Sequence, residues 1–175
     1  MANIKKYRAF EILICFVLLF FAFVLQTTDL IFTYNSPSPS LVLSLIIVVS
    51  FYENYLFSSI FGLIGGILID TVSAGGYGFF ALMYMLTAFI CNVIIKAYLQ
   101  NNFASLAVIA TPVIIINMLA EAIFKTGFSK GIFSLFFNFY IIVAIYTFVS
   151  AFLFYLIFRY IIKKDEKFKK PKGII

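Results

Sequence analysis

The sequence lacks histidine and tryptophan and has few charged residues. Of its 175 residues, 11% are charged and only 7 are acidic, whereas 64% are hydrophobic. Without histidine there is no imidazole base and no usual zinc or haem ligand set. Soluble domains are about 45 to 50% apolar and about 25% charged. The composition, with a mean hydropathy of +1.11, excludes a water-solvated globule and predicts an integral membrane protein.

Cysteine is scarce, and its two copies lie inside apolar runs. A disulfide framework needs several paired cysteines and a structural zinc site needs clustered thiolates, so Cys15 and Cys91 indicate neither. Asp70 has no second aspartate in the apolar runs to pair with. Intramembrane proteolysis therefore lacks its usual groups. We expect no metal, no cofactor and no enzymatic activity.

The apolar residues fall into six runs, if about 20 residues make a full crossing. The runs cover approximately residues 10–25, 41–52, 55–69, 79–95, 103–124 and 132–162. The second and third meet at Glu53, which a single continuous helix would bury near the bilayer centre at a cost of roughly 2.5 to 3.5 kcal/mol. A tight helical hairpin avoids this cost. The last run must tilt, begin in the interface or extend into the cytoplasm. We expect one all-α transmembrane domain over residues 1–175, a bundle of six helices.

Positive charge is concentrated at the two ends of the chain. With six crossings, eleven of the thirteen basic residues fall on one side of the membrane, which by the positive-inside rule is the cytoplasm. Both termini are therefore expected there, and residues 163–175 are predicted to form a basic cytoplasmic tail. Basic side chains near the surface each attract anionic lipid by about 1 kcal/mol. The residues for which we expect these roles are Lys5, Lys6, Arg8, Arg159, Lys163 and Lys164.

A basic start followed by an apolar run is also typical of a secretory signal peptide. No small-x-small cleavage site follows residues 10–25, and further apolar runs come after them. The first run is therefore interpreted as a membrane span. The basic residues between the two ends are too few to line a groove for nucleic acid.

The third run has a feature that a plain membrane anchor does not need, a face of small residues that ends in a carboxylate. Its members recur every four residues and share one side of a helix, where small residues let another backbone approach closely. They are Ser58, Gly62, Gly66 and Asp70. Packing within the chain and packing against another subunit both fit this face.

A glycine-rich turn follows the third run. Gly75, Gly76 and Gly78 allow positive φ and a sharp re-entry into the membrane. A phosphate-cradling loop is the functional alternative, but no lysine follows the glycines and no strand precedes them.

Asp70 lies fifteen residues beyond Tyr55, which is about 22 Å along a helix axis and places it near the outer interface. A negative charge at a helix C-terminus opposes the helix dipole, so its partners are expected beyond its own helix. Three roles remain open. Asp70 organises the turn through backbone amides there or at the start of the next helix, contacts a partner protein, or handles a proton or ligand.

The fifth run contains Pro112, which removes a backbone hydrogen bond and is expected to kink the helix. Asn117 follows one to two turns later. A binding cavity at this point is one interpretation, and a kink without a ligand is the other.

Four stretches of the sequence resemble the MreD family of rod shape-determining membrane proteins. They are Gln26-Thr27-Thr28 at the end of the first run, Pro39-Ser-Leu-Val-Leu43, Phe61-Gly-Leu-Ile-Gly-Gly-Ile-Leu-Ile-Asp70, and Gly78-Phe-Phe-Ala-Leu-Met-Tyr84. They cover roughly the first half of the chain, whereas beyond Lys96 only hydropathy agrees. The family often has Pro-Asp-Leu where this chain has Pro39-Ser40-Leu41, so a role of that aspartate does not carry over.

The resemblance implies a non-enzymatic scaffold of the cell-elongation complex in the bacterial inner membrane, which helps to maintain cell shape by coordinating lateral peptidoglycan synthesis. Its implied partner is MreC, a single-span protein with a large external domain. The implied complex also includes MreB, RodA and a class B penicillin-binding protein. We expect the partner to dock on the small-residue face and the turn after Asp70.

MreD-like chains are also similar in architecture to the substrate-binding S components of energy-coupling-factor transporters, so binding of a vitamin is the alternative function. S components usually carry an Ala-x-x-x-Ala motif on the first helix. The run over residues 10–25 has no such motif, and the chain has no tryptophan for a ligand site.

Overall fold

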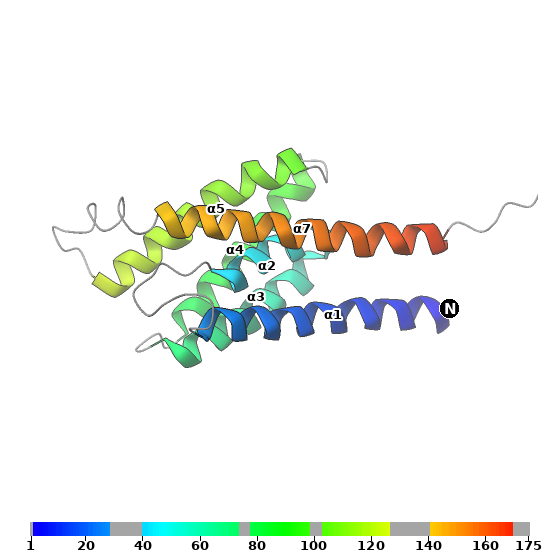
Figure 1. The fold of residues 1–175 in the computed structure, drawn as a ribbon, viewed down its shortest axis with the longest axis horizontal. Helices are drawn as coiled ribbons and strands as arrows, with labels where there is room; N and C mark the ends of the chain where they lie inside the picture. The colour runs from blue at the N-terminus through cyan, green and yellow to red at the C-terminus, as the bar shows by residue number, and fades with distance from the viewer. Residues whose placement is uncertain (1, 29–39, 74–77, 99–102, 127–140, 170–175) are drawn as a thin grey trace, which may run out of the picture.

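The protein is built from α-helices, as its composition predicts. The computed structural model describes residues 2–28, 40–73, 78–98, 103–126 and 141–169, with side-chain surroundings for residues 11–28, 40–73, 78–97, 103–123 and 142–160. These parts contain six helices and no strand (Figure 1). The helices are α1 (Ala2–Thr27), α2 (Leu41–Tyr52), α3 (Tyr55–Val72), α4 (Phe79–Tyr98), α5 (Phe103–Thr126) and α7 (Ile141–Lys169).

Four of these helices are long and apolar enough to cross a membrane, with mean hydropathies between 1.7 and 2.2. Their apolar segments are Tyr55–Val72, Phe79–Ala97, Phe103–Ile123 and Ile142–Tyr160. The apolar segments of α1 and α2, Glu11–Thr27 and Leu41–Tyr52, are shorter. The protein is therefore an all-α membrane protein, and crossing by all six helices stays a prediction.

The helices follow the apolar runs of the sequence but extend beyond several of them. Helix α2 has the bounds of the second run, and α3 begins at Tyr55, so the chain turns at Glu53 and Asn54. Helix α7 continues to Lys169, so residues 163–169 of the expected tail are helical. Of the last run, residues 132–140 lie outside the described residues.

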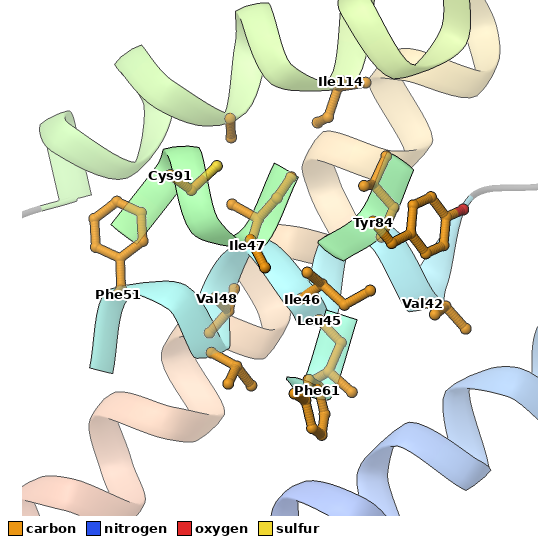
Figure 2. Packing of buried hydrophobic residues seen from close by; sticks show 14 of the residues in the cluster. Val42, Leu45, Ile46, Ile47, Val48, Phe51, Phe61, Tyr84, Cys91 and Ile114 are labelled. Atoms are coloured by element: carbon orange, nitrogen blue, oxygen red, sulfur yellow. The ribbon is translucent and has the colours of Figure 1, made fainter. Parts of the chain in front are cut away.

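Helix α2 forms the centre of the bundle. Every residue from Val42 to Phe51 is buried, on all sides of the helix, because α1, α3, α4, α5 and α7 all contact it. Figure 2 shows its side chains pointing toward Phe61 of α3, Cys91 of α4 and Ile114 of α5. A helix that is apolar all round is stable only when it is enclosed. With 12 residues α2 is about 18 Å long, which is shorter than a hydrocarbon core of about 30 Å.

The beginning of this enclosed helix is capped by side chains of other helices. The first N–H groups of a helix have no partner within it. The Val42 N–H donates to Gln26 Oε1 of α1 at 3.0 Å, and the Ser40 N–H donates to Thr147 Oγ1 of α7 at 3.0 Å. Two neighbouring helices therefore satisfy backbone N–H groups at the start of α2.

The end of α2 is satisfied in the same way. Asn92 of α4 donates both Nδ2 protons, one to the carbonyl oxygen of Ser50 at 2.8 Å and one to that of Glu53 at 2.7 Å. Asn92 is fully buried, and its Oδ1 has no hydrogen-bond partner. The short central helix thus depends on specific polar residues inside otherwise apolar neighbours.

The other helices are arranged around α2. Helices α3 and α4 form the most extensive helix pair. Helix α7 packs on α2 and α5, and α1 packs on α2 and α3 (Figure 1). The start of α1 and the end of α7 lie at the same end of the bundle, on the right in Figure 1.

Candidate docking site at the turn between α3 and α4

The Asp70 carboxylate joins the end of α3 to the beginning of α4. Its Oδ1 accepts the N–H of Phe80 at 3.1 Å, and its Oδ2 accepts the N–H of Ala81 at 2.9 Å. Helix α4 begins at Phe79, so these N–H groups belong to its second and third residues, the groups that an N-cap side chain normally satisfies. Gly78 precedes the helix with φ of +81° and has no side chain for this purpose. Asp70 therefore supplies the cap from α3, and its charge lies at the positive end of the α4 dipole.

The backbones of α3 and α4 touch at two glycines. A Cβ placed on Gly62 would lie 2.5 Å from the carbonyl oxygen of Tyr84. A Cβ placed on Gly66 would overlap Cα of Ala81 and the carbonyl oxygen of Phe80. Backbone atoms cannot rotate away as side-chain ends can. Only glycine therefore permits this approach, and the approach brings α4 within reach of Asp70.

The third glycine of the motif faces a different part of the bundle. A Cβ on Gly65 would lie 3.1 Å from Cδ1 of Ile46 and Cγ1 of Val42, and 3.3 Å from Cδ1 of Leu19. These atoms are side-chain ends of α1 and α2. Gly65 thus gives α3 a close fit to the core, while Gly62 and Gly66 fit it to α4.

The structure brings most of the small-residue face against α4. Gly62, Gly66 and Asp70 all meet α4, and Ser58 is buried with its hydroxyl donating to the Tyr55 carbonyl at 3.2 Å. The remaining predicted members of the turn, Gly75 and Gly76, lie outside the described residues. Because α4 covers Gly62 and Gly66, another helix cannot pack on these backbone positions without displacing α4.

Exposed residues surround this joint. Ile67, Thr71 and Val72 at the end of α3 are exposed, as is Leu82 in the first turns of α4. Of these, Val72 and Leu82 each keep 58% of their surface. These four residues are called the tip surface below. They are held by the joint but do not form it.

The basic residues predicted at the membrane surface are divided between the two termini. Arg159 is exposed at the end of the apolar segment of α7. Lys5, Lys6 and Arg8 lie in the beginning of α1, and Lys163 and Lys164 lie in the end of α7, but their side chains are outside the described part. Lys96, exposed near the end of α4, donates to Asn54 Oδ1 at 3.2 Å. The start of α1 and the end of α7 lie at the same end of the bundle, so the basic residues of the two termini belong to that end (Figure 1).

Several polar residues with structural roles were missed by sequence reasoning. Gln26, Thr147 and Asn92 cap α2, and Ser150 Oγ of α7 donates to Ser44 Oγ of α2 at 2.9 Å. The available signal was the occurrence of single polar residues inside long apolar runs. That signal does not reveal the partner, because the partner lies on another helix.

The described residues form no cluster of metal ligands and no disulfide. No group of three or more cysteine, aspartate or glutamate side chains there is close enough to hold a metal ion. Cys15 and Cys91 are both free and buried. What these residues assemble is a packing joint with an exposed rim.

Comparison with known proteins identifies the family. The family model described as rod shape-determining protein MreD matches residues 6–164. Searches of curated proteins and of solved structures give no match to this chain. Because the family model covers most of the chain, the chain belongs to the MreD family, and its role is in the determination of rod shape.

Proposed function

We propose that this MreD-family chain is a membrane scaffold of the cell-elongation complex that binds an MreC-like single-span protein through its tip surface. The observation that carries the proposal is the joint of Asp70 with the start of α4. It fixes the two helix ends relative to each other, with bonds of 2.9 and 3.1 Å. A partner that docks there meets a preformed surface and orders few new groups on binding.

The tip surface supports this site better than the small-residue face does. Gly62 and Gly66 are covered by α4, whereas Val72 and Leu82 are exposed. Two apolar side chains at the end of membrane helices suit contact with the membrane segment of a partner or the residues that flank it. The partner chemistry we assign to this surface is an apolar helix.

The wider role follows from the same proposal. MreB, RodA and a class B penicillin-binding protein complete the complex, and the chain coordinates lateral peptidoglycan synthesis by position rather than by catalysis. We place the chain in the bacterial inner membrane with both termini in the cytoplasm. The gathering of α1's start and α7's end, with their basic residues, at one end of the bundle supports this orientation.

The transporter alternative would need a cavity of the size of a vitamin. The cavity beside the beginning of α2 has a volume of about 10 Å³. Pockets for organic ligands usually have volumes of about 300 to 1,000 Å³. This cavity is therefore far too small for a vitamin.

Co-purification from detergent tests the proposal. The double variant Val72→Ala and Leu82→Ala removes apolar contact area without touching the joint, and Leu153→Ala on α7, exposed by 55%, is the matched control. We expect recovery of the MreC-like protein to fall at least several-fold in the double variant and to stay unchanged in the control. Equal recovery with all three proteins, each folded and equally abundant, would rule out the tip surface as the docking site.

A further inference from the structure

A small cavity lies where the beginnings of α2 and α4 meet the last turns of α5. It is partly enclosed and has a volume of about 10 Å³. Tyr84 lines this cavity, and its hydroxyl points toward the beginning of α2 (Figure 2). Its walls include Ser40, Phe80, Tyr84, Asn117, Met118 and Glu121.

The cavity lies at one end of two segments that are long and apolar enough to cross a membrane. Phe79 and Phe80 begin the apolar segment Phe79–Ala97, and Glu121 is near the end of Phe103–Ile123. Lipid headgroups lie at this depth, just beyond the hydrocarbon core.

The polar groups of the cavity are rich in acceptors. Asn117 donates its Nδ2 protons to Thr87 Oγ1 at 3.0 Å and to a carbonyl one turn earlier at 2.9 Å. Its Oδ1 accepts the Thr87 hydroxyl at 3.4 Å and has a second lone pair. The hydroxyls of Ser40 and Tyr84 lie 3.2 Å apart, and one donates to the other. Glu121 contributes carboxylate oxygens, which have about four lone-pair sites and can accept a further bond beside those they already make.

A primary ammonium group has the complementary chemistry. It is a cation with three N–H donors and no acceptor. Phe80 and Tyr84 also contribute aromatic rings to the wall. A cavity of about 10 Å³ holds one group of the size of water, which fits an ammonium but not a trimethylammonium group.

The surroundings of the cavity fit a lipid as the source of this ammonium. Leu86 and Ile90 of α4 and Leu119 and Ile123 of α5 are exposed apolar residues on the two helices that border it. Acyl chains can therefore lie along these helices while the headgroup reaches the cavity.

We propose that the cavity binds the primary ammonium of an aminophospholipid such as phosphatidylethanolamine. The Glu121 carboxylate is the counter-ion, and Asn117 Oδ1 and the hydroxyl pair of Ser40 and Tyr84 accept the ammonium protons. This site is independent of the scaffold role and of the tip surface.

Native mass spectrometry of the full-length chain tests the site. The probes are phosphatidylethanolamine, its mono- and dimethyl derivatives and phosphatidylcholine, all with the same acyl chains. Each methyl group removes a donor and adds volume, so binding should fall along the series. Charge-assisted hydrogen bonds of about 1.5 kcal/mol or more predict a preference for the ethanolamine lipid over the choline lipid of at least about 10-fold.

Variants locate the preference within the chain. Glu121→Gln should abolish it, whereas Glu11→Gln, which changes another half-buried carboxylate on α1, should leave it intact. The series on the unaltered chain needs no variant to fold.

Equal binding of the ethanolamine and choline lipids overturns the proposal, because a cavity that holds only water gives that result. A preference that survives in folded Glu121→Gln also overturns it. Loss of MreC-like partner binding in Glu121→Gln without any lipid preference assigns the cavity to a basic side chain of the partner and likewise overturns the lipid site.

Discussion

Adding one methyl group at Gly66 should open the joint between α3 and α4. In Gly66→Ala the new Cβ overlaps backbone atoms of Ala81 and Phe80, so the two helices must separate by about 1 Å to restore van der Waals contact. Overpacking of this kind costs about 1 to 3 kcal/mol. Separation also lengthens the bonds of Asp70, one turn away, and the loss of a cap costs about 1 kcal/mol. Replacement of glycine within a helix returns about 1 kcal/mol, so net destabilisation of about 1 to 3 kcal/mol is expected.

The neighbouring variant Gly65→Ala is the matched control. Its Cβ meets the side-chain ends of Ile46 and Val42 at 3.1 Å, and these can shift by a few tenths of an ångström. The higher helix propensity of alanine, worth about 1 kcal/mol, then offsets the strain. This variant should therefore have nearly the same free energy of unfolding as the unaltered chain. The two alanine variants should therefore differ by roughly 2 kcal/mol.

Unfolding of the full-length chain by increasing fractions of SDS in mixed micelles, followed by far-ultraviolet circular dichroism, measures this difference. Alkylation of Cys91 gives a second readout, because this thiol on α4 is buried and becomes reactive when α4 separates from its neighbours. Gly66→Ala should unfold at a lower SDS fraction and react faster. If both variants unfold together, the backbone contact does not have the energetic role assigned to it.

Three further changes test the polar contacts. Asp70→Ala should cost about 0.5 to 2 kcal/mol and increase hydrogen exchange at the Phe80 amide, and unchanged exchange there would contradict the capping role. Asn92→Leu removes the two hydrogen bonds that the amide donates to carbonyl groups at the end of α2, so it should cost about 1 to 3 kcal/mol in the same SDS titration, and equal stability would show that these bonds do not stabilise the chain. Gln26→Leu removes the acceptor for the Val42 N–H and should destabilise the chain by a similar amount, measured as faster amide exchange at the start of α2 and refuted by full protection there.

The sequence was most informative where periodicity and charge act along one segment. The apolar runs predicted an all-helical membrane protein, and the helices follow these runs. The four-residue spacing of Gly62 and Gly66 marked a close-packing face, and the charge of Asp70 at a helix end indicated partners beyond its own helix. Four motifs indicated the MreD family, which the family comparison confirms.

Contacts between distant segments were not predictable in the same way. No local pattern shows that α4 covers the small face, that Gly65 points to α2 instead, or that Asn92 caps α2 from another helix. Burial of α2 on every side was also not predictable, since an apolar run has the same composition whether its side chains face lipid or protein. The cavity beside Tyr84 combines residues from three helices and has no signature in any one of them.

The sequence by itself determined that this protein lies in a lipid bilayer and is built from helices. A chain with 64% hydrophobic residues and charge at its ends must satisfy its backbone hydrogen bonds within apolar helices. Only the tertiary structure decided which helix meets which. In a membrane all apolar faces are nearly equivalent, so pairing rests on the few places where steric fit and polar groups discriminate. Here those places are the glycines that admit the α4 backbone, the carboxylate that caps it, and the amides that close the ends of α2.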